Sequence, residues 1–237
     1  NNTETKFRIG SITKTFTATL IMQAVEKGKI NLDATIDEYF PRITNAKQIT
    51  VRHLLNHRSG VSNFTARSFF SLYTKPITPA ALLDTIVSKG VNFEPNADYS
   101  YSNSNYVLLT FILETVLEKP YTQLLDENIV KPLGLKNTRY GEKTDLAKNE
   151  ARSYHMGDEW TLEPEGHMSA PLGAGGIIST PADLCFFADA LFDGKLISKK
   201  SLQQMKPQGD QSYGFALYGM PTDDLEGIGH GGNIDAF

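Results

Sequence analysis

The clearest pattern near the start of the chain is a helical repeat of apolar residues. Across residues 15–25, apolar side chains recur at intervals of three and four positions, and Gly28 stands just beyond them. This spacing is typical of an amphipathic α-helix, and a glycine commonly ends such a helix. The pattern therefore predicts a helix with Ser11 at its entrance and Lys14 three residues further on, along the same face.

Other helices are indicated by the residues at their ends. Thr78 and Thr180 each stand before a proline, which is favoured at the first helical position, and Gly90 and Gly194 follow the apolar segments. We therefore expect helices over residues 50–57, 79–89 and 181–192. The stretch 105–117 is apolar on nearly every face, which predicts a buried central helix.

Strand candidates are few in this chain. We expect one over residues 213–218 and another around Ile228 and Ile234, where apolar and small residues follow one another. No internal repeat, low-complexity tract or long linker is visible. With 237 residues, the chain is long enough for one large domain, or two closely packed lobes, with a sizeable core.

Composition narrows the function classes. A net charge of -4 and a pI near 5.8 give no electrostatic case for binding nucleic acid or an anionic membrane. No apolar run reaches the roughly 18 residues that a membrane-spanning helix needs. The single cysteine, Cys185, cannot form an internal disulfide, and the five scattered histidines give no spacing typical of a metal site.

Ser11 and Lys14 form a Ser-x-x-Lys motif at the entrance of the first helix. A serine hydroxyl becomes a good nucleophile when a neighbouring base takes its proton, and a neutral lysine amine can be that base. The helix N-terminus adds partial positive charge, which opposes protonation of Lys14 and favours an oxyanion at Ser11. Taken alone, the motif also fits a capping serine followed by a solvated lysine.

A second polar cluster, residues 99–105, stands directly before the predicted central helix. Its serines and asparagines are good helix caps, so a polar turn is one interpretation. A functional interpretation places Tyr101 and Asn103 on a loop that faces a cleft. The Tyr101 phenol could then be held as phenolate or relay a proton, and the Asn103 amide could donate to a substrate carbonyl while accepting from Lys14.

A third cluster is the segment His230-Gly231-Gly232-Asn233. Glycines beside a polar residue in a strand let another backbone approach closely, as a substrate bound at a strand edge requires. An ordinary glycine-rich turn is the alternative. The remaining histidines, His53, His57, His155 and His167, have no partner spacing and are expected to be structural or on the surface.

Together, the three motifs in this order resemble the penicillin-recognising serine hydrolases. The most similar branch comprises class C β-lactamases, D-alanyl-D-alanine carboxypeptidases and related esterases, which carry Ser-x-x-Lys, then Tyr-x-Asn, then Lys-Thr-Gly or His-x-Gly. The resemblance covers almost the whole chain and includes segments 54–60, 131–135 and 175–180. It implies an α+β fold of the β-lactamase/transpeptidase type, with a helical lobe and an antiparallel sheet flanked by helices. Residues 1–237 would form a single two-lobed domain with the active site between the lobes.

The resemblance also implies roles for individual residues. Ser11 would be the nucleophile and Lys14 its activating partner, while Tyr101 would act as general base and acid. The backbone amides of Ser11 and Asn233 would form the oxyanion hole. The remaining candidates would bind substrate, and they are Asn103, His230, Gly231 and Gly232. No cofactor or metal is implied, and the expected partner is a small-molecule or peptide substrate.

Two departures from the family pattern affect these expectations. His230 stands where the β-lactamases usually have lysine, and Gly231 replaces threonine. Because an imidazole with a pKa near 6.5 is mostly neutral at pH 7, we expect weak anchoring of a substrate carboxylate, with loss of any anchoring as the pH rises through about 6.5. In addition, the family has strands and a helix before the first motif and after the third. We therefore expect strands to be missing at both ends and self-association through open sheet edges.

The chain lacks the defining motifs of two other classes of protein. An α/β-hydrolase would need Gly-x-Ser-x-Gly, and a nucleotide-binding loop would need Gly-Lys-Ser/Thr; neither occurs. The alternative that remains is a penicillin-binding-like sensor or scaffold that keeps the pocket without turnover. No signal peptide is visible in the sequence, and the resemblance alone suggests a periplasmic or extracellular location.

Overall fold

The computed structural model describes residues 2–65, 73–209, 211–221 and 226–237. The α-helices are α1 (Thr13–Glu26), α2 (Val51–Leu55), α4 (Pro79–Lys89), α5 (Asn103–Leu117), α6 (Tyr121–Leu125), α7 (Lys131–Leu133), α8 (Pro181–Phe192) and α9 (Lys199–Met205). Short 3-10 helices are η1 (Gly10–Ile12), η4 (Leu146–Lys148) and η5 (Leu172–Ala174), and η3 (Asp126–Val130) is a π-helix. The strands are β1 (Phe7–Arg8), β2 (Arg139–Tyr140), β3 (Tyr154–Met156), β4 (Trp160–Leu162), β5 (Ile177–Ser179), β6 (Tyr218–Gly219) and β7 (Ile228–Gly229).

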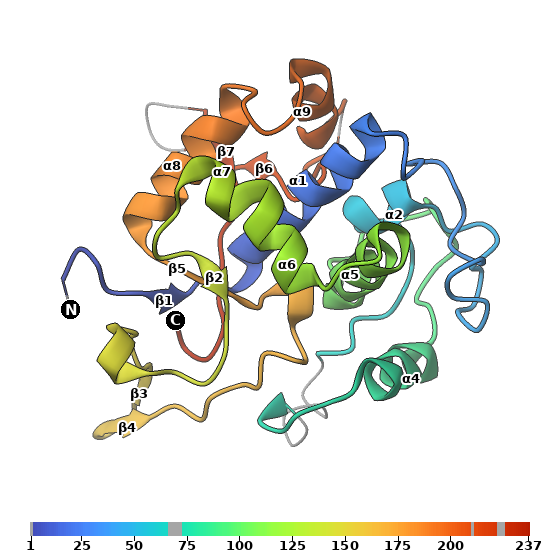
Figure 1. Ribbon diagram of the computed structural model, residues 1–237. Helices are drawn as coiled ribbons and strands as arrows, with labels where there is room; N and C mark the ends of the chain where they lie inside the picture. Colours follow the sequence, from blue (N-terminus) through green and yellow to red (C-terminus); the bar gives the residue numbers. More distant parts are fainter. Residues whose placement is uncertain (1, 66–72, 210, 222–225) are drawn as a thin grey trace.

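Helices α1 and α5 pack against each other in the middle of the molecule (Figure 1). The prediction of a buried helix over residues 105–117 is confirmed, because α5 is buried continuously from Ser104 to Thr110. The helix begins two residues earlier than predicted, at Asn103. Tyr101 therefore precedes the helix, whereas Asn103 occupies its first turn instead of the preceding loop.

Helix α1 is buried on more faces than its apolar repeat predicts. Thr17 and Thr19, which lie off that repeat, are both fully buried. Their hydroxyls are satisfied inside the protein, since Thr19 donates to the Thr15 carbonyl at 2.8 Å and Thr17 to the Gly173 carbonyl at 2.7 Å. A threonine can be buried in a core when a backbone carbonyl accepts a hydrogen bond from its hydroxyl. These hydrogen bonds therefore allow α1 to be a central helix beside α5.

The predicted helix ends are confirmed for α4 and α8. Thr78 accepts a hydrogen bond from the Ala81 amide and Thr180 accepts one from the Asp183 amide, each at 3.2 Å. Such caps satisfy amides that have no partner within the helix. Helix α2 is shorter than the predicted 50–57, because it ends at Leu55 and His57 has a left-handed backbone, with φ 58°.

The central sheet is antiparallel, in the order β1-β5-β2. Phe7 pairs with Ser179 on one side of β5, and Tyr140 pairs with Ile177 on the other. All of β5 is buried. The family resemblance implied an antiparallel sheet, but strands of two or three residues are too short to show an alternating pattern, so the local sequence did not predict β1, β2 and β5.

The strand prediction over residues 213–218 is wrong for most of its length. Ala216 has φ 54°, so the chain turns sharply there, and Tyr213 forms only an isolated bridge with Tyr218. The regular pairing is confined to β6 and β7, with Tyr218 opposite Gly229. The predicted strand around Ile228 is confirmed at Ile228–Gly229, whereas Ile234 lies in the turn beyond it.

Strands β3 and β4 form a hairpin at the lower left of the view in Figure 1. Its register places Tyr154 opposite Leu162 and Met156 opposite Trp160, so these four apolar side chains share one face. All four are exposed, Trp160 at 67%. This hairpin is the largest exposed group of apolar side chains along a single element pair in the described part of the chain.

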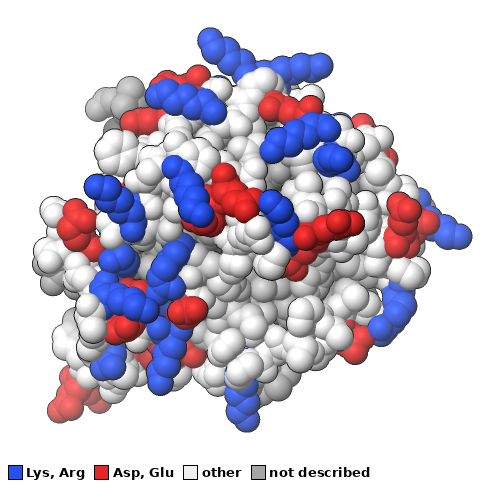
Figure 2. Space-filling view, viewed as in Figure 1, with Lys and Arg blue, Asp and Glu red and all other residues white. Residues whose placement is uncertain are grey.

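On the face shown in Figure 2, lysines and arginines lie interspersed with aspartates and glutamates. Neither sign forms a large separate field on that face. Among the described residues, no helix combines the length and apolar character required to cross a bilayer. The same described residues contain no group of His, Cys, Asp and Glu that could hold a metal ion.

Candidate active site

Ser11 lies in the single turn of η1, between the edge strand β1 and helix α1. The preceding Gly10 has φ 50°, and a Cβ built on it would lie 2.8 Å from the Asn233 backbone nitrogen. Only glycine combines this backbone conformation with so close an approach. Gly10 therefore lets Ser11 sit directly beside the segment that contains Asn233.

Lys14 is fully buried below Ser11. Its Nζ lies 2.7 Å from Asn103 Oδ1, 2.7 Å from the Ala174 carbonyl oxygen and 3.0 Å from Ser11 Oγ. Burial lowers the pKa of this amine well below 10.5. A neutral amine has two N–H groups for the two carbonyl oxygens and one lone pair for the Ser11 hydroxyl proton, so the neutral form matches this set of partners.

Tyr101 is the second side chain that contacts Ser11 Oγ. Its phenol donates a hydrogen bond to Ser11 Oγ at 2.8 Å, and Lys14 Nζ lies 4.9 Å from the centre of its ring. Burial raises the pKa of Tyr101 above the ordinary value of 10.0. The suggestion that Lys14 holds it as a phenolate is therefore wrong for the resting site. Burial favours the protonated phenol, and Lys14, whose own pKa burial lowers, supplies no full positive charge that would hold a phenolate.

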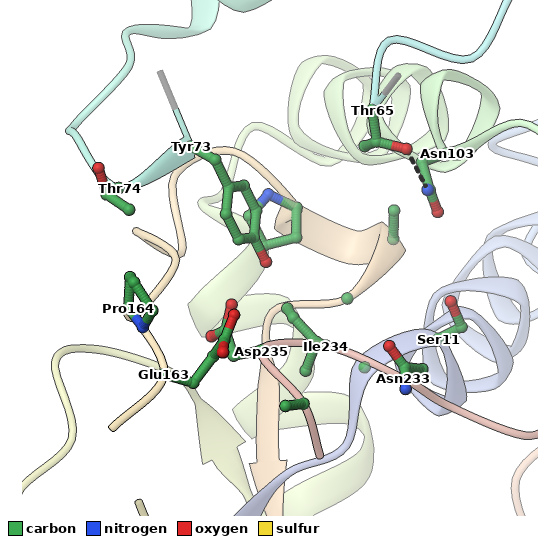
Figure 3. Close-up of a pocket in the computed structure, with 15 residues that line it drawn as sticks. Ser11, Thr65, Tyr73, Thr74, Asn103, Glu163, Pro164, Asn233, Ile234 and Asp235 are labelled. Carbon is green, nitrogen blue, oxygen red and sulfur yellow. Dashed lines mark hydrogen bonds between the residues drawn. The ribbon is translucent and has the colours of Figure 1, made fainter. Parts of the chain in front are cut away.

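Asn103 links Lys14 to the far side of the cleft. Its Oδ1 accepts from Lys14, as predicted, while its Nδ2 donates to Thr65 Oγ1 at 3.0 Å (Figure 3). The backbone amide of Asn103 also donates to Asn63 Oδ1 at 3.1 Å. The side-chain donor that was expected to meet a substrate carbonyl is thus engaged by Thr65 in this structure.

His230 is held as a neutral imidazole. Its Nδ1 lies 2.5 Å from the Gly231 carbonyl oxygen and must donate to it, so Nε2 accepts from the Tyr213 hydroxyl at 2.9 Å. Burial lowers the pKa of His230 to about 4. The expected loss of charge near pH 6.5 is therefore wrong, because the ring has already lost its proton well below that pH.

The backbone around Gly232 packs against the backbone around Ser11. A Cβ on Gly232 would lie 2.0 Å from the Ile9 carbonyl oxygen and 3.1 Å from the Ser11 nitrogen. Gly231 donates its own amide to the Tyr218 hydroxyl at 2.9 Å. Neither the Ser11 nor the Asn233 amide donates a hydrogen bond within the described part of the chain.

A buried ion pair holds the segment that contains Asn233 in place. Arg8, in β1, lies 2.6 Å from the Asp235 carboxylate, and both side chains are only 2% exposed. Arg8 also donates to the Gly166 carbonyl at 2.7 Å. Because β1 leads directly into η1, this pair fixes Asn233 next to Ser11, and two backbone amides at that point could stabilise an oxyanion.

Two cavities meet at Ser11. One, of about 600 Å³, is lined by Tyr99, Tyr101, Tyr213, Tyr218 and His230, together with Ser11 and residues 231–233, and is called the tyrosine cavity below. The other, of about 350 Å³, lies toward Thr65, Asn103, Tyr73 and Asp235 (Figure 3). Ser11 and Asn233 line both, so a substrate that reaches Ser11 can extend in two directions.

All the site residues expected from the sequence gather around Ser11, but His57 was not recognised as part of their support. It is fully buried, and its Nδ1 lies 3.2 Å from the Ser102 amide nitrogen and from Asn105 Nδ2. Its ring lies 4.4 Å from that of Tyr101. The helix that precedes it was expected over residues 50–57, yet nothing in the sequence showed which residues His57 would contact.

Comparison with known proteins identifies the family of this chain. The sequence profile of the beta-lactamase family matches residues 1–237, and the chain belongs to that family. It is 33% identical over 223 residues to the penicillin-binding protein PbpX of Bacillus subtilis (strain 168), covering 93% of this chain and 55% of that protein. It is also 25% identical over 229 residues to a teichoic acid D-alanine hydrolase of Staphylococcus aureus, covering 94% of this chain and 56% of the relative.

The chain also resembles solved structures in its fold. D-amino acid amidase from Ochrobactrum anthropi SV3, solved with D-phenylalanine, superposes with a TM-score of 0.89 at 33% identity, covering 99% of this chain and 72% of the other. The predicted α+β fold of the β-lactamase/transpeptidase type is therefore confirmed. The chain spans about half the length of the curated relatives it matches.

Proposed function

We propose that this chain is a serine hydrolase that forms an acyl-enzyme on Ser11 and cleaves an amide or ester bond. The observation that carries the proposal is the position of Ser11 Oγ, 3.0 Å from Lys14 Nζ and 2.8 Å from Tyr101 Oη. A nucleophile between a neutral base and a protonated phenol has the groups that both halves of acyl transfer require. The hydrolase activity of named relatives supports the same reaction class.

In the first half of the reaction, the acylation of Ser11, each group around Ser11 has one role. Lys14 takes the hydroxyl proton as Ser11 Oγ bonds to the substrate carbonyl carbon, and the Ser11 and Asn233 amides stabilise the oxygen that becomes negative. Tyr101 gives its proton to the leaving amine or alcohol as the carbonyl–heteroatom bond breaks. The proton held by Lys14 then restores the Tyr101 phenol, and the acyl group remains on Ser11.

Hydrolysis of the acyl-enzyme repeats these steps with water. Water loses a proton to the Lys14–Tyr101 pair as its oxygen attacks the Ser11 ester, and Ser11 Oγ regains a proton when the acid is released. Candidate substrates are D-alanyl or other D-amino acid amides and esters, D-Ala-D-Ala-type peptides and β-lactams. An ester or amide without a free carboxylate is favoured over a β-lactam or a D-Ala-D-Ala-type peptide, because His230 supplies no lysine-like charge for a carboxylate.

Covalent labelling tests the proposal. A fluorophosphonate probe should label the protein at Ser11, and the label should be lost in Ser11→Ala. With a substrate, Ser11→Ala should lower turnover by about a millionfold, as expected when a hydrolase loses its nucleophile. Undiminished labelling of the Ser11→Ala protein would contradict the assignment of the nucleophile.

The second candidate function is a penicillin-binding-like sensor or scaffold, and the same site could serve it. A fluorescent penicillin separates the three possibilities. A hydrolase should release the acylated probe within minutes to hours, a sensor should remain acylated, and a scaffold should be labelled neither by this probe nor by the fluorophosphonate.

A further inference from the structure

The two cavities at Ser11 differ in which catalytic groups they expose. Tyr101 and His230 line the tyrosine cavity and not the second one, whereas Asn103 and Thr65 line the second and not the first. Ser11 and Asn233 belong to both. The two ends of a substrate that is bound at Ser11 therefore meet different surroundings.

The position of the proton donor determines which cavity holds the leaving group of the substrate and which holds the acyl group. A leaving amine or alcohol needs a proton from a group within hydrogen-bond reach. Lys14 is fully buried and bonded to Asn103 and Ala174, so Tyr101 is the donor that the cleft exposes. The leaving group consequently lies on the side of Tyr101, and the acyl group extends toward Asn103.

The tyrosine cavity is aromatic and uncharged among its described lining residues. The rings of Tyr213 and Tyr218 are stacked with centres 6.0 Å apart, and Tyr99 lies 5.9 Å from Tyr213. The ring of His230 lies 5.1 Å from that of Tyr218. Both of its nitrogens are engaged by Gly231 and Tyr213, so neither is left for a substrate carboxylate.

We infer that the tyrosine cavity is a leaving-group subsite that selects uncharged aromatic or apolar amines and alcohols and discriminates against leaving groups that carry a carboxylate. This inference rests on the proposed acyl-enzyme function. An aromatic leaving group gains apolar contact with the four tyrosines. A carboxylate would lose water there without meeting a cation, which makes its entry unfavourable. The subsite therefore favours amidase or esterase substrates over peptides that end in a free carboxylate.

Three D-alanyl esters that share one acyl group test this selection. The alcohols are 4-methylbenzyl alcohol, 4-(hydroxymethyl)benzoate and 4-(aminomethyl)benzyl alcohol, which are neutral, anionic and cationic at pH 7. Their charged groups are distant from the scissile bond, and the uncatalysed hydrolysis rates are measured to correct for any chemical difference. We expect kcat/KM for the neutral ester to exceed that for the anionic ester by at least about tenfold.

A charge introduced into the cavity provides the matched variant. Tyr99 is 39% exposed, and its hydroxyl makes no hydrogen bond within the described chain, so Tyr99→Arg leaves the core intact. This variant should raise the anionic-to-neutral ratio of kcat/KM by at least about tenfold. Tyr154→Arg makes the same substitution on the exposed β3–β4 hairpin, outside both cavities, and should leave the ratio unchanged.

The outcomes separate failure of the inference from failure of the proposed function. Equal kcat/KM values for the neutral and anionic esters, or no change of the ratio in Tyr99→Arg, would overturn the subsite while acylation of Ser11 still stands. A clear preference for the cationic ester would overturn it as well, because the rings would then bind cations through their faces. If no ester is hydrolysed and Ser11 is not labelled by the fluorophosphonate, the proposed function itself fails.

Discussion

At the scale of single residues, the site depends on protonation states that burial imposes. Lys14 and His230 both have basic side chains, yet burial lowers the pKa of each and favours its neutral form. Burial raises the pKa of Tyr101, so its phenol stays protonated. Removing a charge from water costs free energy unless a partner of opposite charge is present. No carboxylate pairs with Lys14 among the described residues, so desolvation determines its state.

The neutral state of Lys14 predicts a specific pH profile. Because burial lowers its pKa, the acylation rate should be lost as the pH falls and should reach its plateau at a pH well below 10.5. Lys14→Ala should nearly abolish acylation, and Lys14→Arg should not restore it, since a guanidinium keeps its proton up to a pH above about 12. Single-turnover acylation between pH 5 and 10 measures this. A fully active Lys14→Arg protein would show that a neutral amine is not required.

Tyr101→Phe tests the proton donated to the leaving group. Removing only the phenolic oxygen should lower the acylation rate by about 10²–10⁴-fold, the usual size of a general acid–base contribution. The loss should be smaller for esters whose alcohols leave easily, because they need less proton donation. A rate equal to that of the unmodified protein for both good and poor leaving groups would reduce Tyr101 to a packing role.

At the scale of elements, the site depends on contacts between segments far apart in the sequence. His57, just beyond α2, accepts from the Ser102 amide, and its carbonyl accepts from the Ser100 amide at 3.1 Å. Tyr101 lies between these two bonded residues, and Asn103 follows them. The turn after α2 thus positions the segment that carries the phenol and the amide.

A pair of His57 variants should separate positioning from general stability. His57→Phe keeps a ring but loses the acceptor, and should lower kcat by about tenfold to a hundredfold, as misplaced catalytic groups do. His57→Asn keeps an acceptor and tolerates the left-handed backbone at φ 58°, so it should recover part of that loss. Kinetics and melting temperatures are measured together. If the loss of kcat in each variant is proportional to its loss of melting temperature, His57 contributes to stability alone and does not position Tyr101.

At the scale of the whole molecule, two neutral histidines, the buried His57 and the partly buried His230, should make the protein sensitive to acid. The unfolded chain protonates His230 near pH 6.5, whereas burial lowers its folded pKa to about 4. The unfolding free energy should therefore fall as the pH decreases from 6.5 to 4, by up to about 3 kcal/mol for this residue. His57, whose pKa burial also lowers, acts in the same direction.

Urea unfolding at pH 7 and pH 4.5 measures this acid sensitivity. His230→Gln should show a smaller loss of stability at the lower pH than the unmodified protein. His155→Gln, at an exposed position on β3, should show the same loss as the unmodified protein. Identical losses in all three proteins would mean that other groups determine the acid response.

The exposed apolar face of the β3–β4 hairpin bears on the expected self-association. Trp160 is 67% exposed and Met156 is 56% exposed, side by side in the register. Exposed groups of this kind promote association. Trp160→Lys should shift the 237-residue chain toward monomer in sedimentation velocity, whereas Gln203→Lys on α9 should not. If the unmodified chain remains monomeric at high concentration, neither the hairpin nor the sheet edges drive association.

The sequence by itself determined the order of the three motifs, the family and the helices with strong end signals. Ser11 and Lys14 share a helix entrance, and Thr78 and Thr180 begin helices, because these are local relationships within a few residues. Short strands such as β5 escaped prediction, since their pairing partners are more than thirty residues away and a few residues carry no period.

Only the tertiary structure decided the protonation states and the division of the cleft. The neutral forms of Lys14 and His230 arise from burial by segments distant in the chain, and so does the protonated phenol of Tyr101. Likewise, Tyr99 is distant in sequence from Tyr213 and Tyr218, and the three line one cavity only because the tertiary structure brings their segments together beside Ser11. Desolvation and side-chain convergence depend on which surfaces meet, and local sequence does not specify that.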